Sequence, residues 1–231
     1  MRSTPTHVFF WFGPLSNWHR GRPFSGERAW EETVARLDAL GIERPSDDAL
    51  SSRLLRAATY VCGEQWMMAC KAWLFDRSFV MTRCDVEATP IEKVLPAALD
   101  ARVDVPGQPP IKRARVWSTP LARILRASDP KEQKAIGRDV QDYVDAVWTA
   151  ARVPCVVAGT IARMENDPQA RDVLLGTGDR LLVEGSPHDR IWGVGLKWDD
   201  PAIEDPARWR GLNLLGIAHG EARPLLRKAF A

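Results

Sequence analysis

The chain has 231 residues, of which 45% are apolar and 27% are charged, and its formal net charge is +2. These values are typical of a soluble globular protein, and residues 1–231 are enough for one elaborated domain with a sizeable core. The small net charge excludes a nucleic-acid binder that relies on a strong basic excess. No apolar run approaches the ~20 residues that span a bilayer, and the first twelve residues lack a signal-peptide pattern, so we expect no membrane partner.

The cysteines and histidines predict a reduced protein without a metal. Cys62, Cys70, Cys84 and Cys155 form no C-x-x-C pair. Two of them lie in apolar helical segments, where reduced cysteine behaves as a small hydrophobic residue, so we expect a cytoplasmic location. His188 has no partner at metal-ligand spacing, and no metal site is predicted.

The first third of the chain predicts one strand and several helices. Residues 7–12 form a β-branched and aromatic run, typical of a strand. Residues 27–40 repeat apolar side chains at helical spacing. A short helix is expected over 54–58, with Ser51 or Ser52 as its N-cap.

The rest of the chain predicts mainly helices and one further strand. Residues 78–119 are rich in proline and are expected to be loop with a short helix over 91–100. Further helices are predicted over 120–125, from Pro130 with Ser128 or Asp129 as N-cap, over 139–152, over 153–165 beyond a break at Pro154, within 166–177, and from 216 to 227. The pattern of residues 181–184 predicts a strand. The expected class is therefore α+β, a mainly helical single domain with a few short strands.

The stretch 63–75 is the most informative, because it carries an acid and an amine in an otherwise apolar helix. Glu64 and Lys71 are nearly two turns apart, so they share a face and lie roughly 10 Å apart along the axis. A small molecule along that face could contact both. The structural alternative is a packed helix, since Trp66 and Trp73 have core spacing, Glu64 suits the positive end of the helix dipole, and Lys71 could extend to water.

A set of short motifs follows in order along the chain. They include Leu15-Ser16-Asn17-Trp18, Glu64-Gln65-Trp66-Met67-Met68 with Lys71-Ala72, Asp129-Pro130 with Lys134 and Gly137-Arg138, Leu182-Val183-Glu184, Asp189 with Ile191-Trp192-Gly193-Val194-Gly195, and Asn213-Leu214-Leu215-Gly216. This ordered set resembles the NADAR family, which includes the YbiA-like N-glycosidases. The resemblance covers most of the chain outside two expected insertions, at about 25–60 and 78–120.

The resemblance implies a YbiA-like fold and an enzyme that hydrolyses an N-glycosidic bond between a ribose and a base-like amine, without metal or cofactor. Two substrate classes are known for the family: ADP-ribose attached to guanine in nucleic acid, removed as an antitoxin activity, and a phosphoribosylated intermediate of riboflavin biosynthesis. We favour the first slightly, because the basic segment 112–115 could contact a DNA phosphate. That class would also imply an operon-encoded toxin partner. A module that binds ADP-ribose or NAD without hydrolysis is the alternative from another class.

The reaction suits three predicted catalytic residues. Cleavage builds positive charge on the anomeric carbon and negative charge on the leaving base. Glu64, partly buried among tryptophans, would have a raised pKa and act as general acid and then base. Lys71 would have a lowered pKa, and the resemblance gives it attack on the anomeric carbon through an opened-ring Schiff base. Asp189 would orient ribose hydroxyls or offset positive charge, and the sequence leaves open which acid protonates the base.

The predicted substrate-binding residues are Asn17, Trp148, Trp192, Gly193, Gly195 and Asn213. The tryptophans would wall the sugar and base, the glycines would let backbone N–H groups approach a phosphate, and the asparagines would bond a base edge or hydroxyl. The Gly-x-Gly lacks the third glycine and the long preceding strand of a dinucleotide site, which excludes such a site. Structural alternatives are a core position for Trp148, a turn for Asn17 and a cap of the last helix for Asn213. His219 is expected to be packed or at the surface rather than catalytic.

Overall fold

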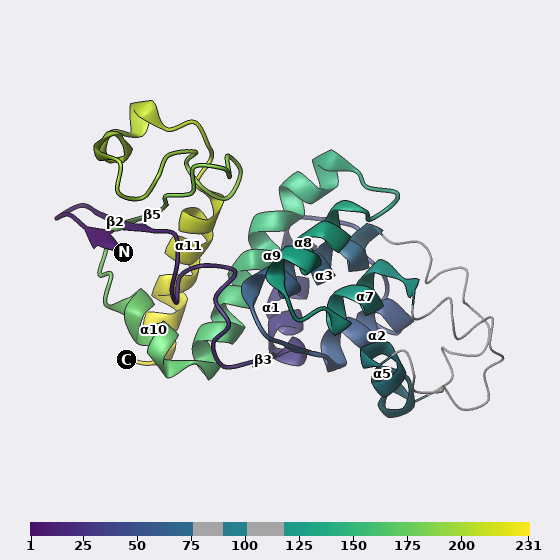
Figure 1. Cartoon of the computed structure of the whole chain (residues 1–231). Coiled ribbons are helices and arrows are strands. Elements are labelled where there is room, and N and C mark those ends of the chain that lie inside the picture. Colours follow the sequence, from purple (N-terminus) through teal and green to yellow (C-terminus); the bar gives the residue numbers. More distant parts are fainter. Residues whose placement is uncertain (76–89, 101–117) are drawn as a thin grey trace.

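The computed structural model describes residues 1–75, 90–100 and 118–231 (Figure 1). The basic segment 112–115, Cys84 and most of the second expected insertion lie outside the described residues. The described part is mainly helical with a few short strands, which confirms the predicted α+β class.

The short strands are interspersed among the helices along the chain. The helices are α1 (Gly26–Ala39), α2 (Leu50–Ala57), α3 (Gly63–Phe75), α5 (Ile91–Leu99), α7 (Pro120–Arg126), α8 (Pro130–Arg138), α9 (Asp145–Asn166), α10 (Pro168–Leu175) and α11 (Leu214–Ala229), with 3-10 turns η1 (Pro201–Glu204) and η2 (Pro206–Arg208). The strands are β1 (Arg2–Ser3), β2 (His7–Phe10), β3 (Phe24–Ser25), β4 (Thr59–Tyr60) and β5 (Leu181–Glu184).

The larger sheet has the order β1-β2-β5, and its parallel pair positions the site. β2 and β5 are parallel, with Phe10 opposite Glu184, although they lie far apart in sequence. Parallel strands end at the same edge of a sheet. The loop after β2 and the loop after β5 therefore begin side by side. β3 and β4 form a separate antiparallel pair.

A large core joins the helices. In Figure 1, α9 lies between the sheet with α11 on one side and the group of α1, α3, α7 and α8 on the other. α9 packs against α1, α3 and α11. Trp66 and Trp73 of α3 are fully buried, as their helical spacing predicts. Residues 25–60, expected as an insertion, supply α1 and α2 to this core, with Trp30 and Leu54 buried in it.

Two details of the helices correct the predictions. Ser51 and Ser52, expected as candidate caps, lie inside α2 and are buried. Pro154, expected to separate helices over 139–152 and 153–165, lies within the single helix α9. Proline removes one backbone hydrogen bond from a helix interior, but α9 packs against α1, α3, α10 and α11 and continues through Pro154.

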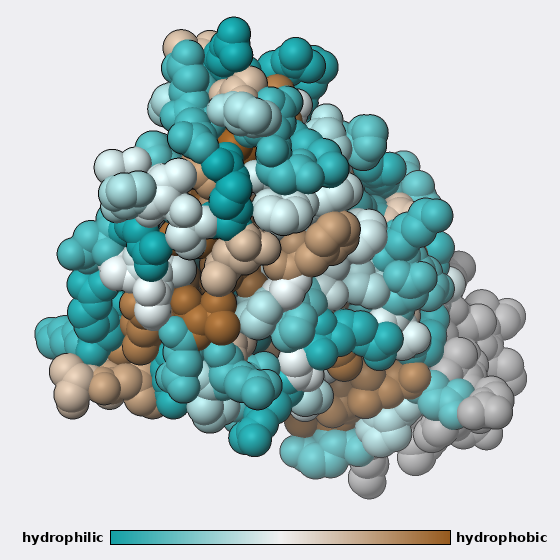
Figure 2. Space-filling model, turned by 60° about the vertical axis from the view of Figure 1, so that its left-hand side comes forward, coloured by the Kyte–Doolittle hydropathy of each residue, from teal (hydrophilic) through white to brown (hydrophobic). Residues whose placement is uncertain are grey.

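One face of the molecule is predominantly polar (Figure 2). Figure 2 shows one face, on which hydrophilic residues surround several separate hydrophobic patches. Within the described ranges, no helix combines the length and the apolar character needed to span a membrane. The described cysteines, Cys62, Cys70 and Cys155, are free and buried.

Candidate active site

The loop after β2 forms one wall of the site, and two buried side chains anchor it. Arg163 of α9 donates to the carbonyl oxygens of Pro14 and Ser16, at 3.1 and 2.9 Å. His219 of α11 is fully buried; its Nε2 lies 2.7 Å from the Leu15 oxygen and its ring contacts Thr160. Burial lowers the pKa of His219 to about 3, so it is neutral and structural, as expected for a packed residue.

Glu64 lies in the first turn of α3 and contacts this loop. Its backbone N–H donates to the Asn17 oxygen at 2.9 Å, and the Trp18 indole N–H donates to its Oε2 at 3.2 Å. Only 3% of Glu64 is exposed, and its Oε1 has no hydrogen-bond partner within the described part of the chain. Burial raises its pKa to about 7, although the positive charge of Lys134 opposes the rise. A pKa in this range suits a group that holds and releases a proton near neutral pH, and the catalytic role of Glu64 stays a prediction.

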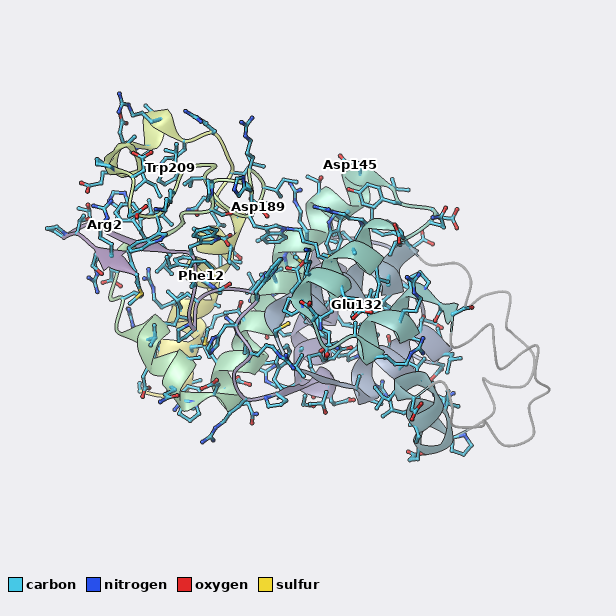
Figure 3. All side chains as sticks on the ribbon, in the orientation of Figure 1. Arg2, Phe12, Glu132, Asp145, Asp189 and Trp209 are labelled. Carbon is cyan, nitrogen blue, oxygen red and sulfur yellow. The ribbon has the colours of Figure 1, made fainter. Side chains whose placement is uncertain are left out.

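Asp189 follows β5 and is held as a carboxylate. Burial alone would raise its pKa, but backbone N–H groups of Trp192 and Ile191, at 2.8 and 3.0 Å, and Lys134, at 3.3 Å, bring the pKa below its ordinary value. In Figure 3, Asp189 lies on the side of the sheet region that faces α8 and α9. Of the two acids predicted from the sequence, Glu64 thus has a raised pKa and Asp189 a lowered one. Such a pair suits acid–base chemistry, in which one group donates a proton while the other stays ionised.

Glu184 is a third acid of this cluster and is not among the predicted site residues. It is the last residue of β5. Its backbone N–H donates to Asn213 Oδ1 at 3.0 Å, and its backbone oxygen accepts from the Val194 N–H at 3.0 Å. Its Oε2 is buried and has no partner among the described residues. Burial, then the charges of Asp189 and Glu64, raise its pKa to about 8. The signals in the sequence are an acid that closes an apolar strand and its place in Leu182-Val183-Glu184, one of the motifs that carry the resemblance.

Lys134 and Trp18 also join the site without having been selected from the sequence. The Lys134 ammonium lies 5.9 Å from the Trp18 ring centroid while it pairs with Asp189. The N-cap Asp129 starts α8 and Pro130 fills its first position, as predicted, which orients this helix. Lys134 thus links the acid after β5 to the loop after β2.

Lys71 lies further along α3 than Glu64. It is half-buried, and its ammonium lies 4.4 Å from the Tyr143 ring centroid. Burial and the positive charge of Arg138 lower its pKa, which is the predicted direction for a nucleophilic amine. Its role stays a prediction.

The predicted substrate-binding residues divide into loop residues near the acids and residues of the core. The backbone N–H of Trp192 donates to the Asp189 carboxylate. Gly193 packs closely against the backbone: a Cβ there would lie 2.9 Å from the backbone oxygen of Glu184 and 3.1 Å from that of Asp189. Gly195 has φ +70°, a conformation that favours glycine. These glycines shape the loop; their contact with a phosphate stays a prediction.

Trp148 and the two asparagines have structural contacts. Trp148 is buried, with its ring centroid 6.5 Å from that of Phe75, in the core. Asn213 precedes α11, but its side chain makes no capping bond; it bridges Leu182 and Glu184 instead. Asn17 is buried and its backbone oxygen accepts from Glu64. Across the described residues, no group of three or more His, Cys, Asp or Glu side chains forms a metal site.

A family profile matches the sequence of this mainly helical α+β protein. The NADAR domain profile matches residues 111–227, just over half of the chain, and the chain belongs to the NADAR family. The α3 helix lies outside the matched range, and the fold brings it to the matched part.

Three relatives are similar over part of their length. The chain is 32% identical over 94 residues to "N-glycosidase R617" of Acanthamoeba polyphaga mimivirus, which covers 41% of this chain and 55% of that protein. It is 33% identical over 108 residues to "N-glycosidase Npun_R5314" of Nostoc punctiforme, covering 47% and 62%. It is 29% identical over 100 residues to "Riboflavin biosynthesis protein PYRR, chloroplastic" of Zea mays, covering 42% and 14%. The similarity thus spans at most about three fifths of these proteins.

Proposed function

We propose that this protein is an N-glycosidase that hydrolyses the bond between a ribose and a base-like amine. The observation that carries the proposal is a buried Glu64 that holds a proton near neutral pH, beside an Asp189 that Lys134 and two backbone N–H groups keep ionised. The names of the mimiviral and Nostoc relatives support the same class of reaction.

The environments favour Glu64 over Asp189 as the proton donor. Glu64 donates its proton to the leaving nitrogen as the C1′–N bond breaks, so the base departs as a neutral amine. The Asp189 carboxylate offsets the positive charge that develops on C1′ and the ring oxygen. Water adds to C1′, its proton passes to Glu64, and the acid is restored.

Lys71 offers a covalent variant of the same reaction. Its amine attacks C1′ and expels the base, which takes its proton from Glu64. Opening of the ring breaks the C1′–O4′ bond, a proton from the amine passes to O4′, and an imine joins Lys71 to C1′. Water then hydrolyses the imine and releases the sugar. The lowered pKa of Lys71 supports this variant, because only the neutral amine is nucleophilic.

Two phosphorylated substrates are candidates. ADP-ribose on guanine is favoured by the basic segment 112–115, which lies outside the described residues. The name of the maize relative favours the second candidate, a phosphoribosylated intermediate of riboflavin biosynthesis. A binding module would instead retain the ligand without turnover.

The test offers both substrates to the wild type and follows the released sugar and base by mass spectrometry. We expect one substrate to be cleaved, with Glu64→Gln slowed by roughly 100-fold or more, the scale of general acid catalysis. Glu132→Gln, at an exposed position of α8, is the matched control and should cleave normally. A fully active Glu64→Gln would contradict the mechanism.

Lys71→Ala, run in the same assay, separates the two variants of the reaction. Loss of turnover, together with loss of a borohydride-trapped adduct seen in the wild type, would support the covalent route. Unchanged turnover by Lys71→Ala would reject the covalent route and support direct attack of water on C1′. Ligand binding by the wild type without any cleavage would favour the binding module.

A further inference from the structure

The contact between α3 and α8 sets two rows of side chains against each other. Glu64, Met68 and Lys71 lie at positions i, i+4 and i+7, on one face of α3. On α8, Gly137 packs against the middle of this row: a Cβ at Gly137 would lie 2.1 Å from the Met68 sulfur. A side chain there would collide with Met68 in its present position, so glycine permits this close approach.

The flanking residues of α8 therefore face the two ends of the α3 row. Lys134 and Arg138 are one turn apart and share a helix face. Lys134 belongs to the Glu64 end, where it contacts Trp18 and Asp189. Arg138 directly follows Gly137, and its positive charge lowers the pKa of Lys71 and, as a smaller effect, opposes the rise in the pKa of Glu64.

The two ends differ in their charge balance. At the first, Lys134 faces the carboxyl groups of Glu64 and Asp189. At the second, the two basic side chains are Arg138 and Lys71, and neither forms a salt bridge with a carboxylate in the parts of the chain that the structure describes. Arg138 is exposed, and Lys71 lies against the Tyr143 ring. A guanidinium that pairs with no carboxylate among the described residues is complementary to an anion.

We propose that Arg138 binds a phosphate of the substrate and so positions the ribose between Glu64 and Lys71. Guanidinium is suited to this role, because its planar donors match two phosphate oxygens at once. The axial separation of roughly 10 Å between Glu64 and Lys71 leaves room for a sugar between the acid and the phosphate. The ligand class is a phosphorylated N-riboside, which rests on the proposed function.

The phosphate can belong to a monoester or to a diphosphate, and both present the same oxygens. The test therefore uses Arg138→Gln and Arg138→Lys, with Lys131→Gln, an exposed cation on the same helix, as the control. KM and kcat are compared for the phosphorylated substrate and for the matching nucleoside without phosphate.

For Arg138→Gln we expect KM to rise roughly tenfold or more on the phosphorylated substrate, the loss typical of one charged hydrogen-bonding partner. The KM of the nucleoside should change little, and any change in kcat should be the same for both substrates, because the charge of Arg138 also acts on Lys71 and Glu64. Arg138→Lys should recover part of the affinity, and Lys131→Gln should match the wild type. An equal rise in KM on both substrates, or an unchanged KM on the phosphorylated substrate, would overturn the assignment.

Binding of ribose 5-phosphate and of ADP-ribose, measured by calorimetry, tests the phosphate site independently of turnover. Binding to the wild type that weakens in Arg138→Gln, without cleavage of any substrate, would keep the phosphate site and reject the N-glycosidase. Equal binding by wild type and variant, or binding by neither, would reject the site. The stronger of the two ligands identifies monoester or diphosphate.

Discussion

Glu64 occupies a position where two electrostatic effects oppose each other. At the first turn of α3 the helix dipole favours a carboxylate by ~0.3–1 kcal/mol. Burial without full hydrogen bonding costs an ionised carboxylate several kcal/mol. Burial wins, and the pKa of Glu64 rises to about 7. Asp189 shows the reverse outcome, because three donors are close enough to offset its burial.

The raised pKa values of Glu64 and Glu184, about 7 and about 8, make stability depend on pH. The folded state holds protons that the unfolded state releases above its ordinary value of 4.5. The stability that these acids contribute is therefore complete below that value and is lost as pH rises through about 7 and about 8.

We expect Glu184→Gln to stabilise the protein at pH 8.5 by ~1–3 kcal/mol, since it removes a buried acid that must otherwise ionise. At pH 4 the variant and the wild type should be nearly equal, because the acid is neutral in both states. Urea unfolding at the two pH values measures the difference, with Glu132→Gln as an exposed control. A pH-independent difference would show that Glu184 acts through packing alone.

Helix contacts depend on where glycine occurs. α9 meets α3 at Gly159, where a Cβ would lie 2.3 Å from the Trp66 ring. α11 carries Gly220, around which a Cβ would meet nothing within 4 Å among the described residues. The two glycines look alike in sequence, since both interrupt a helical pattern, but only one of them is required by a neighbouring helix.

Alanine should consequently have opposite effects at the two positions. Gly159→Ala should destabilise the protein by ~1–3 kcal/mol, because the added methyl group overpacks the core against a buried indole. Gly220→Ala should stabilise it by ~0.5–1 kcal/mol, because alanine restricts the unfolded chain and favours helix. Thermal and chemical unfolding of both variants check the signs. Similar effects at both sites would contradict the packing argument.

At the scale of the whole molecule, the site depends on contacts between distant parts of the chain. The loop that presents Trp18 to Glu64 is tied to α9 by Arg163 and to α11 by His219. Arg163 is fully buried, and burial lowers its pKa to about 10. Its two bonds to the backbone of Pro14 and Ser16 hold the wall of the site to the core.

Arg163→Met should cost ~2 kcal/mol of stability or more, because two carbonyl oxygens lose their donors in a buried setting. Where the variant remains folded, turnover should fall further than stability explains, since the Trp18 wall is no longer fixed. Circular dichroism confirms folding before kcat is measured. Arg171→Met, which changes a half-buried arginine of α10, is the control. Full activity in folded Arg163→Met would reject the anchoring role.

The local sequence determined most of the elements. Apolar spacing predicted α1 and α3, Asp129 with Pro130 predicted the start of α8, and the short apolar run at 181–184 predicted β5. These features depend on neighbours within a few residues, so the pattern alone is enough. Pro154 shows where the local pattern is not enough. Proline usually ends a helix, but here the helix continues through it and packs against α1, α3, α10 and α11.

The sequence by itself also predicted Glu64 and Asp189 as candidate acids, since an acid in an apolar helix and an acid beside a glycine-rich turn are recognisable in the local pattern and lie in the motifs that carry the family resemblance. Only the tertiary structure decided that Glu184 and Lys134 join them. The parallel pairing of β2 with β5, and the close approach of α8 to α3, bring these groups together. Such contacts depend on the burial of side chains far apart in the chain, which no local pattern encodes.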